Sequence, residues 1–171
     1  LDGLDFECIY TIRDPLASYT SLMKHWLSFG GYKNVTPSTY FFHMNRMFNG
    51  LKDTINIQKK THVIKLENLH IYNTKVMRDL SNKLEISYHS VMTQSTYHGK
   101  LWWGDKVSGK DLNGVNPNFK NKVDEKLFFK KDIQCIESYL KAFILKYEYS
   151  FRSKDLGNNL IKFLPFKFEL I

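Results

Sequence analysis

An arginine and a serine eight positions apart, Arg13 and Ser21, have the types and spacing to do chemistry together. The guanidinium of an arginine carries a fixed positive charge and a planar set of N–H donors that fits a phosphate group. A serine hydroxyl can donate a further hydrogen bond to a phosphate oxygen. If Ser21 lies about two turns into a helix that begins just after Arg13, both side chains can reach one anionic group. The spacing therefore predicts a phosphate clamp.

The residues around this pair predict a buried strand, a sharp turn and a helix. Residues 8–12 form a short apolar run of the length expected for an interior strand. Asp14 can cap the helix, and Pro15 suits its first position because proline lacks the N–H that would be unpaired there. Ligands of open α/β sheets lie beyond the carboxyl ends of the strands, beside helix N-termini. The alternative is a capped helix in which Arg13 is only solvated or ion-paired.

The run Ile-Arg-Asp-Pro-Leu-Ala-Ser-Tyr-Thr-Ser at residues 12–21 resembles the 3′-phosphate-binding signature of the PAPS-dependent sulfotransferases. These enzymes transfer a sulfuryl group from 3′-phosphoadenosine 5′-phosphosulfate (PAPS) to a hydroxyl acceptor and release 3′-phosphoadenosine 5′-phosphate (PAP). The resemblance implies that Arg13 and Ser21 hold the 3′-phosphate. It also implies the sulfotransferase fold, a P-loop-NTPase-like α/β fold with a parallel sheet flanked by helices.

Segments further along the chain agree with this fold class. Residues 62–66 read as a second interior strand that leads into Glu67. Val63 to Leu69 resemble the family's strand that ends in a Glu-Asp-Leu-like triplet. Leu66 stands where many cytosolic members place an aromatic residue against the adenine. Helices are expected from Ser38 toward Ile57 and over about 73–84. This order of elements is typical of a parallel sheet with covering helices.

Glycine, proline and asparagine residues between 89 and 123 predict a long loop. The resemblance to the sulfotransferases implies that this loop lies over the nucleotide or acceptor site. Aromatic residues at its centre could stack on a base while Lys100 reaches phosphate. Trp102 and Gly104 match in spacing a Gly-x-x-Trp-x-Gly loop of bacterial-type sulfotransferases. Gly99-Lys100 resembles a basic–glycine element that the cytosolic branch places on the 3′-phosphate. An aromatic plug at the end of the core is the alternative interpretation.

The remaining segments are interpreted more simply. The lysine-rich stretch 120–131 predicts a solvated face, with binding of an acidic glycan as a second interpretation. A helix from about Lys131 to Tyr147 should pack on the sheet, and the apolar tail from Phe163 should dock on the body or on a second chain. Cys8 and Cys135 are expected to be buried free thiols.

Composition limits the class of protein. A length of 171 residues suits one domain over 1–171, and a net charge of +8 favours anionic partners. The histidines and cysteines show no metal-ligand spacing, so no metal is expected. No apolar run predicts a membrane span and no signal peptide opens the chain, so a cytoplasmic location is expected.

The sulfotransferases also carry a Gly-rich P-loop after their first strand, which binds the 5′-phosphosulfate and supplies a catalytic lysine or arginine. No such run occurs here. The resemblance therefore implies either the C-terminal part of a sulfotransferase, which is the preferred interpretation, or a divergent inactive domain. No catalytic residue is assigned. Two other classes stay open: a basic nucleic-acid-binding module that stacks bases on Tyr97, Trp102 and Trp103, and an inactive glycan-binding or scaffold domain.

Overall fold

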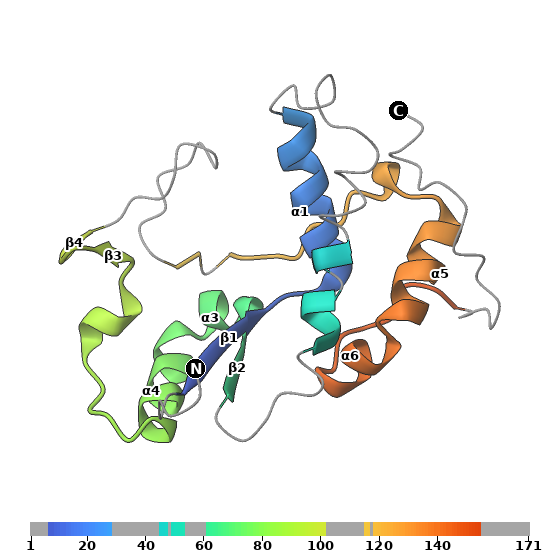
Figure 1. The fold of residues 1–171 in the computed structure, drawn as a ribbon. Coiled ribbons are helices and arrows are strands. Elements are labelled where there is room, and N and C mark those ends of the chain that lie inside the picture. Colours follow the sequence, from blue (N-terminus) through green and yellow to red (C-terminus); the bar gives the residue numbers. More distant parts are fainter. Residues whose placement is uncertain are drawn as a thin grey trace. The chain divides into compact units, whose positions relative to one another are not determined.

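The computed structural model describes residues 7–28, 45–47, 49–53, 61–101, 115–116 and 118–154 (Figure 1). The chain divides into two compact units, which are described separately below. Unit 1 comprises Leu1–Arg13 and Gln58–Asn121, and unit 2 comprises Asp14–Ile57 and Lys122–Ile171. The chain passes from the first unit to the second inside the predicted strand–turn–helix. The single domain expected from the sequence stays a prediction.

Unit 1 contains a parallel pair of strands, β1 (Cys8–Ile12) and β2 (Thr61–Lys65). Their register runs from Cys8 opposite Thr61 to Ile12 opposite Lys65, so both strands end at the same edge of the sheet. A parallel pair needs a long crossover connection, which the chain supplies between residues 12 and 61. The two predicted strands and their parallel, α/β arrangement are confirmed.

The elements that follow β2 are α3 (Leu66–Ile71), α4 (Asn73–Lys83), the short 3₁₀ helix η3 (Ser90–Thr93), and the antiparallel strands β3 (Thr96–Tyr97) and β4 (Lys100–Leu101). The predicted helix over 73–84 is confirmed, whereas α3 was not expected. His98 and Gly99 connect β3 to β4 with φ angles of 49° and 75°. Two successive positive φ angles are typical of a tight two-residue hairpin turn. The described part of the predicted loop over 89–123 thus includes a hairpin.

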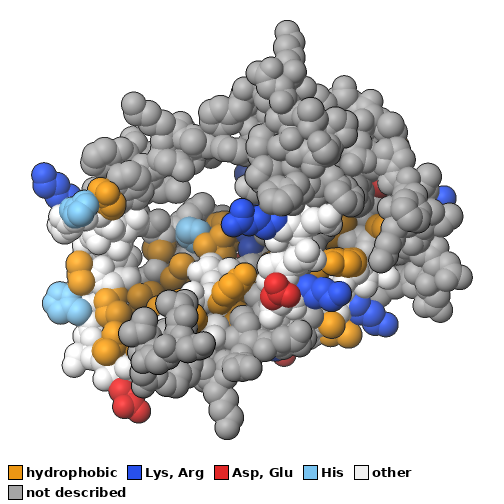
Figure 2. Space-filling model, in the orientation of Figure 1, with side chains coloured by type: hydrophobic (Ala, Val, Ile, Leu, Met, Phe, Trp, Pro, Cys, Tyr) orange, Lys and Arg blue, Asp and Glu red, His pale blue; other side chains and the backbone are white. Residues whose placement is uncertain are grey.

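The burial expected for β1 is wrong. Ile12 is buried, but the four residues before it are exposed, with 51% of Ile9 and 37% of Tyr10 accessible. Figure 2 shows hydrophobic side chains open to solvent on the side of the view where Figure 1 draws β1, β2 and α4. A parallel strand becomes interior only when helices cover both faces of its sheet, and the residues described in unit 1 do not provide that cover. Cys8 is accordingly an exposed free thiol, and Cys135 is a half-buried one.

Unit 2 is helical and holds most of the described core. Its elements are α1 (Pro15–Ser28), helical residues at 45–47 and 49–53, the short 3₁₀ helix η4 (Glu125–Leu127), α5 (Lys130–Tyr139) and α6 (Lys141–Lys146). The core side chains come from α1, from η4 and the residue after it, and from α5, α6 and the residue between them: Leu16, Tyr19, Met23, Leu127, Phe128, Ile136, Leu140, Phe143 and Ile144. The described part of the helix expected over 38–57 is confirmed; the apolar tail lies outside the described residues.

The helix expected from Lys131 to Tyr147 is two helices rather than one. Leu140 ends α5 and begins α6 with φ −99° and ψ 17°, and its side chain is buried. No glycine or proline marks this position, so the break has no local signal in the sequence. We find no physical cause for it beyond the packing of the apolar residues on either side.

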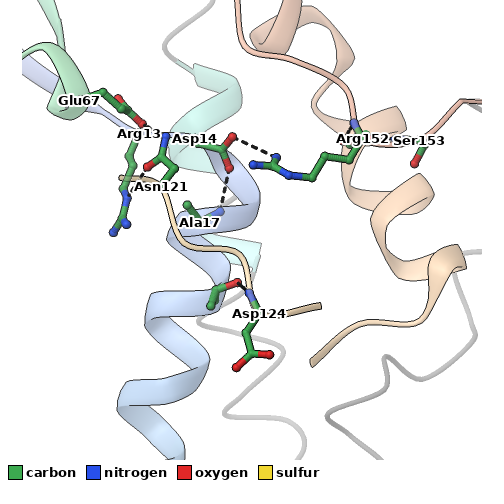
Figure 3. Close-up of polar contacts among 10 residues, drawn as sticks. Arg13, Asp14, Ala17, Glu67, Asn121, Asp124, Arg152 and Ser153 are labelled. Carbon is green, nitrogen blue, oxygen red and sulfur yellow. Dashed lines mark hydrogen bonds and ion pairs between the residues drawn. The ribbon is translucent and has the colours of Figure 1, made fainter. Parts of the chain in front are cut away.

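Two carboxylates organise unit 2. Asp14 caps α1 as predicted: its Oδ1 accepts a hydrogen bond from the N–H of Ala17 at 2.8 Å, and its Oδ2 forms an ion pair with Arg152 Nη1 at 3.1 Å (Figure 3). Glu137 is 1% exposed and accepts the backbone N–H groups of Arg152 and Ser153 at 2.6 and 2.9 Å. These contacts fix the segment after α6 against α5 and α1.

Candidate functional site

Arg13 lies at the edge of the sheet where both parallel strands end. It follows Ile12, the last residue of β1, and Ile12 is opposite Lys65, the last residue of β2. Glu67, in the first turn of α3, therefore comes to the same edge. Carboxyl ends of parallel strands are the usual location of ligands in α/β sheets. The fold of unit 1 places a fixed positive charge there.

The side chain of Asn121 connects Arg13 to Glu67. Arg13 Nε donates a hydrogen bond to Asn121 Oδ1 at 3.2 Å, and Asn121 Nδ2 donates one to Glu67 Oε1 at 2.5 Å (Figure 3). The orientation of the Asn121 amide suits both neighbours, because its oxygen accepts from a cationic guanidinium and its nitrogen donates to a carboxylate. Asn121 thereby holds the half-buried guanidinium by its inner nitrogen.

Phe119 and His70 form an aromatic wall of the site. The guanidinium carbon of Arg13 lies 5.2 Å from the centre of the Phe119 ring, and the rings of His70 and Phe119 stack with their centres 4.5 Å apart. The backbone N–H of Asn116 donates to His70 Nδ1 at 3.1 Å, which leaves the ring proton of the neutral form on Nε2.

The charge state of His70 follows from its surroundings. Burial lowers its pKa, the charge of Arg13 lowers it further, and the carboxylate of Glu67 raises it. The net effect is a pKa below the ordinary value, so His70 is neutral near pH 7 and offers a hydrogen-bond donor rather than a charge. Arg13 is therefore the permanent cation of this cluster.

Among the described residues, no hydrogen-bond partner occupies the terminal nitrogens of Arg13. Within the part of the chain that the structure describes, Arg13 makes a hydrogen bond only through Nε. A guanidinium held at Nε and beside an aromatic ring keeps its remaining N–H groups in a restricted orientation, which suits bidentate binding of phosphate, sulfate or carboxylate. The arrangement can bind an anion at the end of β1.

The other predicted site residues have different outcomes. Ser21 is exposed on α1 in unit 2, while Arg13 belongs to unit 1, so the clamp between them stays a prediction. Lys100 is exposed at the start of β4. Trp102 and Gly104 lie outside the described residues.

Three residues of this cluster were not identified as site residues from the sequence: His70, Phe119 and Asn121. Asn121 and Phe119 lie in the asparagine-rich stretch after residue 115, whose composition indicates only a turn. Their approach to Arg13 depends on contacts across about a hundred positions, and no spacing rule reports such contacts. His70 has a possible signal, since it follows the end of β2 by one helical turn and a half.

Comparisons with known proteins give limited information. No family model matches the sequence, and no curated protein matches it. A sulfotransferase domain from the curacin biosynthetic pathway is similar in structure, with 17% sequence identity and a TM-score of 0.47, over 85% of this chain and 54% of that chain. This chain thus spans about half the length of that protein. The similarity is too distant to assign a fold or an activity.

Among the residues that the structure describes, no group of three or more His, Cys, Asp or Glu side chains is placed to hold a metal ion. None of the described helices has the length and apolar character needed to cross a membrane.

Proposed function

We propose that this chain is a sulfotransferase-like protein that binds the 3′-phosphate of PAPS and PAP through Arg13 and Ser21. On this proposal it supplies the 3′-phosphate-binding half of an enzyme that transfers a sulfuryl group to a hydroxyl acceptor. The resemblance of residues 12–21 to the family signature supports the choice of nucleotide. The confirmed strand, turn and capped helix support the local geometry that the signature requires.

One observation carries the proposal: Arg13 stands at the carboxyl end of a parallel strand, held at Nε by Asn121. A guanidinium in that position can form two parallel hydrogen bonds to phosphate oxygens. Hydrogen bonds to charged groups contribute about 1.5–3 kcal/mol each, enough to distinguish PAP from a nucleotide without a 3′-phosphate. Ser21, about two turns along α1, would donate the further bond.

The chemistry of transfer sets a second requirement. A sulfuryl group moves in line between two oxygens. The site therefore needs cationic side chains that neutralise the charge of the sulfuryl group, and a base that takes the proton of the acceptor hydroxyl. Arg13 and Ser21 act on the far end of the donor nucleotide, so their role is to bind and orient it. The binding energy at the 3′-phosphate is then available to position the reacting end.

Calorimetry with PAP and 5′-AMP tests the proposal on the folded chain. The wild type should bind PAP at least about tenfold more tightly than 5′-AMP. Arg13→Ala should lose that preference, and Arg13→Lys should keep part of it, because lysine retains the charge but not the planar set of donors. Arg46→Ala removes an exposed arginine and serves as the matched control. Equal affinity of the wild type for both nucleotides would contradict the proposal.

A second function is favoured by the β3–β4 hairpin. Tyr97 is 61% exposed, and it is paired in register with Lys100, which is also exposed. An aromatic ring beside a lysine suits a base and its phosphate in single-stranded nucleic acid. Oligonucleotide binding that weakens steeply with salt and is lost in Tyr97→Ala/Lys100→Ala would support this alternative. It would not depend on Arg13.

A further inference from the structure

Unit 2 contains a small pocket to which no role has been assigned above. None of its lining residues belongs to the proposed nucleotide site. It is lined by Lys130, Ile133, Gln134, Arg152, Ser153 and Lys154, and its volume is about 320 Å³. This volume lies near the lower limit of small-molecule sites, about 300 Å³, and suits a ligand of one or two rings.

The walls of the pocket are held in place. Lys130, Ile133 and Gln134 are spaced by three and four residues, so they lie on one face of the first turns of α5. The opposite wall is the segment 152–154, whose first two backbone N–H groups bind the buried carboxylate of Glu137 at 2.6 and 2.9 Å. A site whose walls are fixed before a ligand arrives has less to order on binding.

Three cations line this pocket, and two of them have no counter-charge among the described residues. Lys130 and Lys154 are exposed, and within the described residues neither forms an ion pair or a hydrogen bond. Arg152 Nη1 donates a hydrogen bond to Asp14 Oδ2 at 3.1 Å. The carboxylate of Glu137 nearby is buried and occupied by backbone N–H groups. The pocket therefore has an excess of positive charge that an anion can neutralise.

A buried hydroxyl in the lining points to a ligand independently of the charge. Ser153 Oγ is shielded from solvent, and no hydrogen-bond partner for it occurs among the described residues. Burying a hydroxyl without a partner costs about 1–3 kcal/mol in mutational data, so such a group usually serves a water molecule or a ligand. Figure 3 shows Ser153 next to Arg152 on the segment after α6.

We propose that this pocket binds a small aromatic anion, with its ring against Ile133 and the aliphatic stems of the basic residues. The anionic group would lie between Lys130 and Lys154, and the Arg152 guanidinium can stack on the ring. Inorganic anions lack the ring, and neutral aromatics lack the charge, so both should bind more weakly. This inference does not rest on the proposed nucleotide site.

Calorimetric titration with naphthalene-2-sulfonate tests the proposal, supported by NMR mapping of backbone amides. Saturable one-to-one binding is expected, with shifts at residues 130–134 and 152–154. Lys130→Ala/Lys154→Ala should weaken it roughly tenfold, whereas the control Lys131→Ala/Lys141→Ala, with the same change of charge, should weaken it less than about threefold. Naphthalene-2-sulfonamide should bind about tenfold more weakly than the sulfonate.

Ser153→Ala supplies a test that does not alter charge. Removing the unpaired hydroxyl should raise the melting temperature and weaken binding of the sulfonate a few-fold. Arg13→Ala should leave binding of the sulfonate unchanged, which separates this site from the nucleotide site. Absence of saturable binding, or an equal loss in the two double-lysine variants, would overturn the proposal.

Discussion

Arg13 Nε donates a hydrogen bond to Asn121 Oδ1 at 3.2 Å, although 108 positions separate the two residues in the sequence. Asn121 continues the connection to Glu67 at the start of α3. The strand end brings Arg13 to the edge of the sheet, and a residue from the far end of unit 1 holds its guanidinium there. We therefore expect binding of an anion at Arg13 to depend on this contact.

The first prediction concerns Asn121→Ala. Loss of one hydrogen bond to a charged group should weaken binding of PAP about three- to tenfold by freeing the guanidinium, while 5′-AMP binding stays unchanged. Calorimetry with both nucleotides measures the effect. Asn118→Ala is the control, since in the described part of the chain only the backbone N–H of Asn118 is hydrogen-bonded. Wild-type affinity in Asn121→Ala would show that Arg13 needs no such positioning.

The second prediction concerns the buried carboxylate of Glu137. Glu137→Ala leaves the N–H groups of Arg152 and Ser153 without their acceptor and should lower the free energy of unfolding by about 2–4 kcal/mol. Glu137→Gln keeps one acceptor oxygen and should lose less. Urea denaturation measures both, with the exposed Glu125→Ala as control. If Glu137→Ala were as stable as Glu125→Ala, the segment after α6 would not be held by these bonds.

The third prediction is a pH dependence carried by His70. Its pKa is lowered in the folded protein, first by burial and then by the charge of Arg13, whereas the unfolded chain keeps the ordinary value of 6.5. Below about pH 6.5 the unfolded state therefore binds a proton that the folded state does not, and stability falls as the pH falls. Above pH 7 this contribution is fully present.

Urea denaturation at pH 7.5 and at pH 5.5 isolates this effect. The wild type should lose more stability between the two values than His70→Asn, which cannot titrate. His98→Asn is the matched control, because it makes the same substitution at an exposed turn position where asparagine tolerates the positive φ of 49°. An identical pH dependence in the wild type and His70→Asn would contradict the prediction.

The elements around Arg13 could be predicted from the sequence because their signals are local. An apolar β-branched run gave β1, and Asp14 followed by Pro15 marked the start of α1. The hydrogen bond from Ala17 N–H to Asp14 confirms the cap. The capped start of α1 is produced by residues within one helical turn of each other, so a single sequence is enough to predict it.

Other features depend on contacts between distant residues and could not be predicted in the same way. The approach of Asn121 and Phe119 to Arg13 spans more than a hundred positions. The exposure of Ile9 depends on what covers the sheet and not on its own apolar character. The break between α5 and α6 lies at Leu140, where the sequence has no glycine or proline that would predict the end of a helix.

A double-mutant cycle on the nucleotide tests the central claim most directly. PAP and 5′-AMP would be titrated calorimetrically into the wild type, Arg13→Ala, Ser21→Ala and the double variant. If both side chains hold the 3′-phosphate, each single variant weakens PAP binding, the two effects are not additive, and 5′-AMP binding is unchanged in all four proteins. Loss of PAP and 5′-AMP affinity in equal measure, or no effect of either substitution, would contradict the assignment of the 3′-phosphate to Arg13 and Ser21.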